Sequence, residues 1–171
     1  MGREYERGNT IMRAGNRVAT VGKYASLGIL LVYIIVLIMG ISGTSRSFEE
    51  VSAPLRRTLE NTELIEVNGQ GFRRFYGINP ANLEGVLMFT SEFRLSAEEV
   101  LLIQVHYPEQ IAEIVNIIEE SLATRQEAFG NYVPDEVYWI EHAQLTIRGN
   151  YIFLGIGEQA AEFRQVFLSS L

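Results

Sequence analysis

A run of 22 consecutive uncharged residues, positions 24–45, constrains this chain more than any other feature of its sequence. Its first residue is Tyr24, its last is Ser45, and leucine, isoleucine and valine crowd its centre. As an α-helix the run would be about 33 Å long, enough to cross the roughly 30 Å hydrocarbon core of a bilayer. Apolar side chains would cover every face of that helix, so it has no polar stripe with which to lie along a membrane surface. The run predicts a single transmembrane helix.

The residues around this run indicate its orientation and leave one alternative. The leader, residues 1–23, holds five basic and two acidic residues, and three of the basic ones lie in its second half, next to the run. Arg46 is the one basic residue equally close on the far side, so the positive-inside rule places the leader in the cytoplasm and residues 46–171 outside the cell. Gly40 and Ser42 could instead form the processing site of a cleaved signal peptide. Because the leader and the apolar run are long for a signal peptide, we expect an uncleaved signal anchor.

Residues 46–171 are acidic and contain no lysine: 9 arginines stand against 19 acidic residues, a net charge of −10. Such a surface repels nucleic acid and anionic lipid headgroups, so we expect no nucleic-acid partner. The same charge also favours solubility. The whole chain has no cysteine, which excludes disulfides, thiolate metal ligands and a thiol nucleophile. The segment shows no repeat and no linker, so we expect one extracytoplasmic domain over residues 46–171.

Capping and periodicity signals predict helices at both ends of this domain and in its middle. Ser47 and Glu50 have the spacing of a capping box, which opens a helix that should end near position 60. The strongest helical pattern spans 109–128, where apolar residues form one stripe and glutamates face outward, as in a helix packed on a sheet. Shorter helical segments are expected after a chain break at 68–71, after Pro134 with Val137 and Trp139, and from about Gln159.

Four strands are expected, in two pairs. The apolar runs 85–90 and 100–105 are typical of central strands that are buried on both faces. Residues 143–148 alternate between apolar and polar, Gly149 and Asn150 suit a two-residue turn, and 151–156 returns as the partner strand. The order of elements predicts an α+β fold: an antiparallel sheet of about four strands with helices packed on one face, preceded by the transmembrane helix.

Several short segments give the chain a resemblance to a known family. They are Phe-Tyr-Gly-Ile at 75–78, Arg125, Phe-Gly-Asn-Tyr-Val-Pro at 129–134 and Gly-Asn-Tyr at 149–151. With these segments the chain resembles a bacterial family of unknown function, in which an N-terminal membrane anchor or a lipoprotein signal precedes a small extracytoplasmic α+β domain. The resemblance implies placement and fold, but no activity. Lipid anchoring does not carry over, because this chain has no cysteine.

The sequence holds one arrangement that suggests catalysis, and none that suggests a metal ion or a cofactor. His142 follows Glu141, and such a pair could orient a base for a serine hydroxyl, although no nucleophile-elbow sequence accompanies it. Adjacent glutamates such as Glu98 and Glu99 point apart, and no metal-loop spacing occurs, so we expect no metal site. Two Gly-x-Gly sequences lack the strand–helix context of a dinucleotide fingerprint, so we expect no cofactor.

The remaining candidate is a surface made of arginine and aromatic residues around the predicted turns. These residue types often anchor interfaces, because they combine buried area with polar ends. The long helix would return along the sheet and bring them together. The alternative is a structural corner in which Arg125 bonds carbonyl groups and the tyrosines close the core. The six candidates are Arg125, Tyr132, Trp139, Arg148, Asn150 and Tyr151.

Together these features predict a single-pass bacterial membrane protein with an acidic domain outside the cell. In the absence of a catalytic pattern, we expect a binding or accessory domain of the cell envelope, with another envelope or membrane protein as its partner. A hydrolase or transferase that uses His142 and Glu141 is the first alternative, and a purely structural spacer is the second.

Overall fold

The structure is a computed structural model that describes residues 46–130 and 132–171. The predicted leader, 1–23, and the predicted membrane run, 24–45, lie outside the described residues. Among the helices that are described, none has the length and hydrophobicity needed to cross a bilayer.

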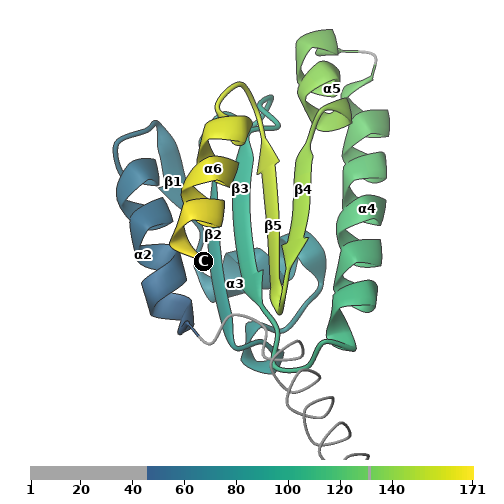
Figure 1. Cartoon of the computed structure of the whole chain (residues 1–171). Helices are drawn as coiled ribbons and strands as arrows, with labels where there is room; N and C mark the ends of the chain where they lie inside the picture. Colours follow the sequence, from purple (N-terminus) through teal and green to yellow (C-terminus); the bar gives the residue numbers. More distant parts are fainter. Residues whose placement is uncertain (1–45, 131) are drawn as a thin grey trace, which may run out of the picture. The chain divides into compact units, whose positions relative to one another are not determined.

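Five antiparallel strands form one sheet in the order β1-β2-β3-β5-β4 (Figure 1). They are β1 (Leu64–Glu66), β2 (Gly85–Ser91), β3 (Glu99–Gln104), β4 (Gln144–Arg148) and β5 (Tyr151–Ile156). The four strands predicted from the sequence correspond to β2, β3, β4 and β5, and every residue of β3 and β5 is buried. About four strands were expected, and β1 was not predicted. Its three residues are too few to show the alternation of apolar and polar residues that marks a strand.

The predicted hairpin joins β4 to β5 through Gly149 and Asn150. Arg148 pairs with Tyr151 in the ladder, so the loop has two residues. Gly149 has a φ of 58°, the positive value that a tight hairpin turn can require at its first loop position. Glycine adopts that value without strain because it has no Cβ. The turn marks one end of the central strands.

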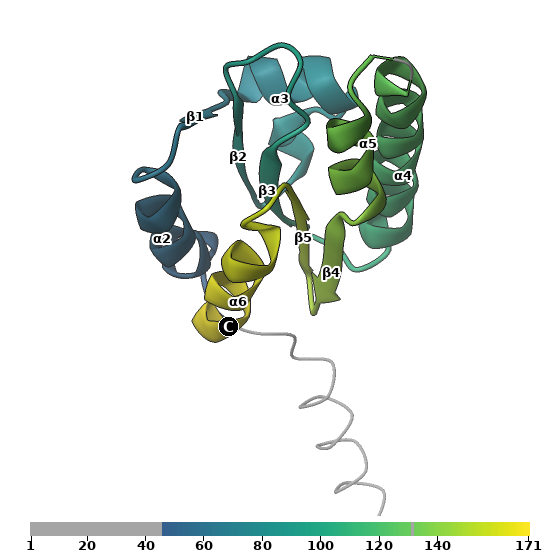
Figure 2. The ribbon, with the colours of Figure 1, turned by 90° about the horizontal axis from the view of Figure 1, so that it is seen from above.

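Helices cover both faces of the sheet (Figure 2). On β3, Val100 and Leu102 pack into one hydrophobic cluster, whereas Leu101 and Ile103 pack into the other, since successive side chains of a strand point to opposite faces. The prediction of helices on one face is wrong, because a strand buried on both sides needs a covering layer on each. The first cluster includes side chains of α2 (Phe48–Leu59) and α6 (Ala160–Ser170), and the second includes side chains of α3 (Gly69–Tyr76), α4 (Gln110–Phe129) and α5 (Pro134–Glu141).

Local capping sets the ends of the first two helices. Ser47 and Glu50 form the predicted capping box at the start of α2. The side chain of Asn68 accepts a backbone hydrogen bond from the first turn of α3, and Gly77, with a φ of 71°, ends that helix. The predicted chain break at 68–71 is therefore wrong, because these residues form the cap and first turn of α3. A short 3₁₀ helix, η1 (Pro80–Asn82), follows.

The beginning of the described chain is held at the hairpin-turn end of the sheet. The hydroxyl of Tyr151 donates to the carbonyl of Arg46 over 3.0 Å, and the Arg46 guanidinium donates to the carbonyl of Ser170 over 2.9 Å. Gln104, the last residue of β3, pairs with Tyr151, so Glu99 at the start of β3 lies at the opposite end of the sheet. At about 3.4 Å per residue, the five steps of β3 separate the two ends by roughly 17 Å.

Candidate functional site

The structure separates the six residues of the predicted surface into two groups. Arg148, Asn150 and Tyr151 lie at the hairpin turn, whereas Arg125 reaches the start of β3 at the other end of the sheet. Tyr151 is fully buried and packs among the side chains of α2 and α6. Tyr151 closes part of the core and Arg125 bonds to a backbone carbonyl, as in the structural-corner alternative. The six residues do not form one continuous surface.

The other two candidates differ in exposure, although both lie near the C-terminal end of α4. Trp139 on α5 is partly buried against the core between the sheet and α4. Tyr132, in the connection between α4 and α5, has 84% of its surface exposed. Neither residue lines the cavity described below.

His142 and Glu141, the candidates for catalysis, make contacts that stabilise the end of α5. The Nδ1 atom of His142 lies 2.8 Å from the carbonyl oxygen of Tyr138, and the two rings stack with centroids 4.1 Å apart. Glu141 accepts a hydrogen bond from Gln126 over 2.8 Å. Within the described part of the chain, no hydroxyl forms a hydrogen bond with His142. The base–nucleophile pair that the sequence suggested is therefore not assembled by these residues.

A buried polar cluster links the sheet to two helices at the start of β3. Glu99 has no exposed surface, and its side chain meets Tyr76 from α3 and Arg125 from α4. The Tyr76 hydroxyl donates to one carboxylate oxygen of Glu99, and Nη1 of Arg125 donates to the other over 2.8 Å. Nη2 of Arg125 also donates to the carbonyl of Ala97 over 2.9 Å. We call Tyr76, Glu99 and Arg125 the buried cluster.

Burial and mutual charge set the protonation of this cluster. Desolvation raises the pKa of Glu99 above its ordinary value of 4.5, while the charge of Arg125 and the hydrogen bonds from Tyr76 and Arg125 lower it. Burial, followed by the nearby charge of Glu99, raises the pKa of Tyr76 well above 10.0. Tyr76 therefore remains a proton donor at physiological pH. Glu99 has no exposed surface, and its hydrogen bonds join β3 to α3 and α4.

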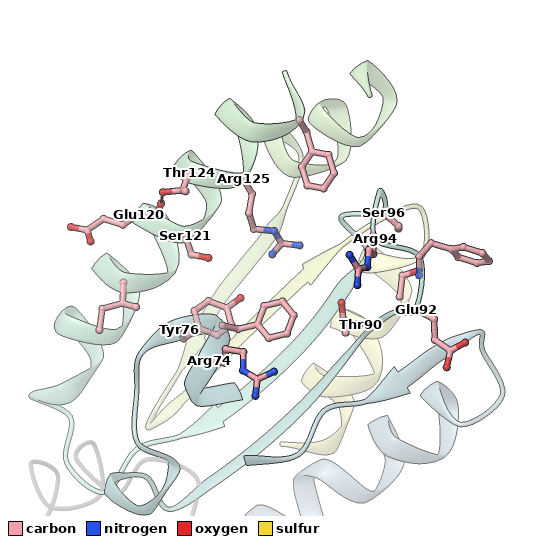
Figure 3. Close-up of a pocket in the computed structure, with 15 residues that line it drawn as sticks. Arg74, Tyr76, Thr90, Glu92, Arg94, Ser96, Glu120, Ser121, Thr124 and Arg125 are labelled. Carbon is pink, nitrogen blue, oxygen red and sulfur yellow. Dashed lines mark hydrogen bonds between the residues drawn. The ribbon is translucent and has the colours of Figure 1, made fainter. Parts of the chain in front are cut away.

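A groove of about 700 Å³ opens beside the buried cluster (Figure 3). The last turn of α3 and the second half of α4 line it, together with the end of β2 and the connection from β2 to β3. Phe75 and Phe93 line it while keeping 49% and 69% of their surfaces exposed. The remaining lining residues are Arg74, Tyr76, Thr90, Ser91, Glu92, Arg94, Ser96, Ile117, Glu120, Ser121, Thr124, Arg125 and Phe129.

The groove gathers positive charge in an acidic domain. Three of the nine arginines of residues 46–171 line it, namely Arg74, Arg94 and Arg125. Figure 3 shows the guanidinium groups of Arg94 and Arg125 directed toward the space between α4 and the β2–β3 connection. The carboxylates of Glu92 and Glu120 point away from that space. The interior of the groove is therefore more positive than the rest of the domain surface.

Of the residues of this site, Arg125 was predicted from the sequence and the others were not. Glu99 precedes four apolar residues in β3, and that position was the one signal of a buried carboxylate, because a central strand has no face for solvent. Tyr76 belonged to a segment that supported the family resemblance, but nothing local connected it to Glu99. Arg74 and Arg94 carry no signal beyond their charge.

The comparison with protein families gives a match over more than half of the chain. Residues 57–157 match the family described as Domain of unknown function (DUF4358). The chain belongs to this family. The match confirms a family of unknown function, and the DUF4358 segment contains all five strands and every residue that lines the groove. The comparison with curated proteins finds no match, and neither does the comparison with solved structures.

Proposed function

We propose that this DUF4358 protein is a membrane-anchored binding domain of the bacterial cell envelope, which docks another envelope protein in the groove beside α3 and α4. The observation that carries the proposal is the groove itself, with two exposed phenylalanines and three arginines along it. Aromatic and arginine side chains supply much of the binding energy at protein interfaces. The lining combines aromatic rings with polar side chains, and binding sites commonly use polar groups to orient a ligand beside apolar ones.

The position of the groove in the domain supports this proposal. Arg46 lies at the hairpin-turn end of the sheet, whereas the groove lies beside Glu99 at the other end. If residues 24–45 span the membrane as the sequence predicts, the chain reaches the domain from the end that lacks the groove. The first described residues therefore do not block the approach of a partner to the groove.

The proposal is tested by crosslinking in intact cells that produce the full chain. A photoreactive p-benzoylphenylalanine replaces Phe93 in the groove or, as the control, replaces Tyr107. Tyr107 is 67% exposed and lies just after β3, at the hairpin-turn end of the sheet. We expect one adduct from position 93 that is absent from position 107. Mass spectrometry identifies the partner, and a crosslinker in that partner should recapture this chain.

Two results would contradict the proposal. Absence of a specific adduct at position 93 would favour the spacer alternative. Failure of protease added to whole cells to reach the domain, under conditions in which a known external protein is cleaved, would contradict the external placement.

A further inference from the structure

The arginines on the walls of the groove have unused hydrogen-bonding capacity. Within the described residues, the side chains of Arg74 and Arg94 form no hydrogen bond and no ion pair. Arg125 uses two of its nitrogen atoms on Glu99 and Ala97. Since each guanidinium carries five N–H donors, most of the donors around the groove remain free for a ligand.

The charges around the groove select an anionic ligand. Glu99 neutralises Arg125, whereas Arg74 and Arg94 form no ion pair among the described residues. Glu92 and Glu120 also line the groove, but their carboxylates point away from its interior (Figure 3). Elsewhere the domain carries a large excess of acidic residues and repels an approaching anion. An acidic partner would therefore be steered away from most of the surface and toward the groove.

The structure favours a carboxylate over a phosphate as the bound group. Phosphate sites in proteins commonly use the N-terminus of a helix or a glycine-rich loop, whose backbone N–H groups surround the anion. Here α3 and α4 present their C-terminal halves to the groove, and no glycine is among its lining residues. A guanidinium can pair with a phosphate as well as a carboxylate, but here the arginines stand on separate elements, which suits the separate carboxylates of a peptide.

We infer that the groove binds an acidic peptide segment of the partner, whose carboxylates pair with Arg74 and Arg94 while an apolar side chain packs against Phe93. This inference rests on the proposed function and adds the chemistry of the bound segment. Most hydroxyls along the groove are already used within the domain. Thr90 and Thr124 donate to backbone carbonyls, and Ser91 and Ser96 accept from backbone N–H groups. The hydroxyl of Ser121 has no hydrogen bond among the described residues, so it can serve an amide group of such a segment.

The test uses the full chain in neutral detergent micelles with 4-fluorophenylalanine at position 93 as a fluorine NMR reporter. The probes are acetyl-Glu-Phe-Glu-amide, its uncharged analogue acetyl-Gln-Phe-Gln-amide, and phenyl phosphate. We expect the acidic tripeptide to shift the resonance with an affinity about tenfold or more above that of the glutamine analogue. Added salt should reduce this preference, because the charges are partly exposed.

Variants assign the preference to particular side chains. Arg74→Gln and Arg94→Gln should each remove much of the tenfold difference between the two tripeptides. Arg148→Gln is the matched control, because Arg148 is exposed at the hairpin turn, away from the groove. It should preserve the preference in full.

Several outcomes would overturn the inference. These are equal affinities for the two tripeptides, tighter binding of phenyl phosphate than of the acidic tripeptide, and no response of the resonance to any probe. An adduct at position 93 in cells together with equal affinities would overturn the inference and leave the proposed function standing. An acidic preference without any adduct in cells would overturn the proposed function alone.

Discussion

Replacing Arg125 with methionine should destabilise the domain, because the change leaves a buried carboxylate without its cation. Glu99 has no exposed side-chain surface, and Arg125 is its ion-pair partner at 2.8 Å. Removing one member of a buried ion pair typically lowers the free energy of unfolding by about 3–5 kcal/mol. Methionine preserves most of the apolar stem of arginine, so the loss reports mainly on charge and hydrogen bonding.

The geometry places the expected loss at the lower end of this range. The side chain of Arg125 is 18% exposed, so some water can reach the vacated position and solvate Glu99. We expect a loss of about 3 kcal/mol, which at a urea slope of about 2 kcal/mol per M lowers the unfolding midpoint by roughly 1.5 M. Urea unfolding of the full chain in neutral detergent micelles measures this shift. Trp139, the single tryptophan, packs against the same core and reports by fluorescence.

The loss should also depend on pH in a defined direction. Removing Arg125 takes away the largest influence that lowers the pKa of Glu99, so that pKa rises further above its unfolded value. A group whose pKa is raised in the folded state contributes its full stabilisation below its unfolded pKa, which for Glu99 is near 4.5. That stabilisation is lost as the pH rises through the pKa of the folded state. The deficit of Arg125→Met relative to the unmodified chain should therefore be smaller at pH 5 than at pH 8.

A second variant separates charge from packing. Glu99→Gln combined with Arg125→Met removes both charges, so the double variant should be more stable than Arg125→Met alone at pH 8. Arg148→Met, at an exposed position, should change the free energy of unfolding by no more than about 0.5 kcal/mol. The reasoning would be refuted if the double variant were no more stable than Arg125→Met, or if the deficit were the same at both pH values.

Two further predictions concern the other face of the sheet. Ser47→Ala removes the capping hydrogen bond of α2 and should lower the free energy of unfolding by about 1 kcal/mol in the same urea assay, whereas an unchanged midpoint would mean that the cap adds nothing. Phe167→Ala empties a fully buried site where the ring stacks on Phe153 with centroids 5.4 Å apart, and should cost about 3–5 kcal/mol. A loss below about 1 kcal/mol would show that α6 is not part of the stable core.

The parts of the fold that could be predicted from the sequence are those whose signals are local. The capping box at Ser47 and the glycine turn at position 149 each depend on a few neighbouring residues, and both are present. The helix predicted over 109–128 is α4, Gln110–Phe129, because its apolar stripe repeats over five turns. The face covered by each helix was not predictable in this way, since a fully buried strand shows no alternation to assign its sides.

The candidate site could not be predicted because its contacts join distant parts of the chain. Tyr76 is 23 residues from Glu99, and Arg125 is 26 residues from it. The sequence showed Glu98 and Glu99 as an adjacent pair, but not that Glu99 is buried. Arg125 was recognised by residue type alone, and its predicted neighbour Tyr151 lies at the other end of the sheet.

The buried cluster connects the stability of the domain to the shape of the groove. Tyr76 on α3 and Arg125 on α4 both bond to the carboxylate of Glu99 on β3, so one side chain fixes the two helices that form the walls. Because Arg125 is committed to Glu99, the guanidinium groups of Arg74 and Arg94 are the ones left to meet a ligand. Loss of the cluster should therefore alter the spacing of the groove walls as well as the free energy of unfolding. Changes at Arg74 or Arg94 should alter ligand binding with little effect on stability, because both side chains are exposed and form no ion pair among the described residues.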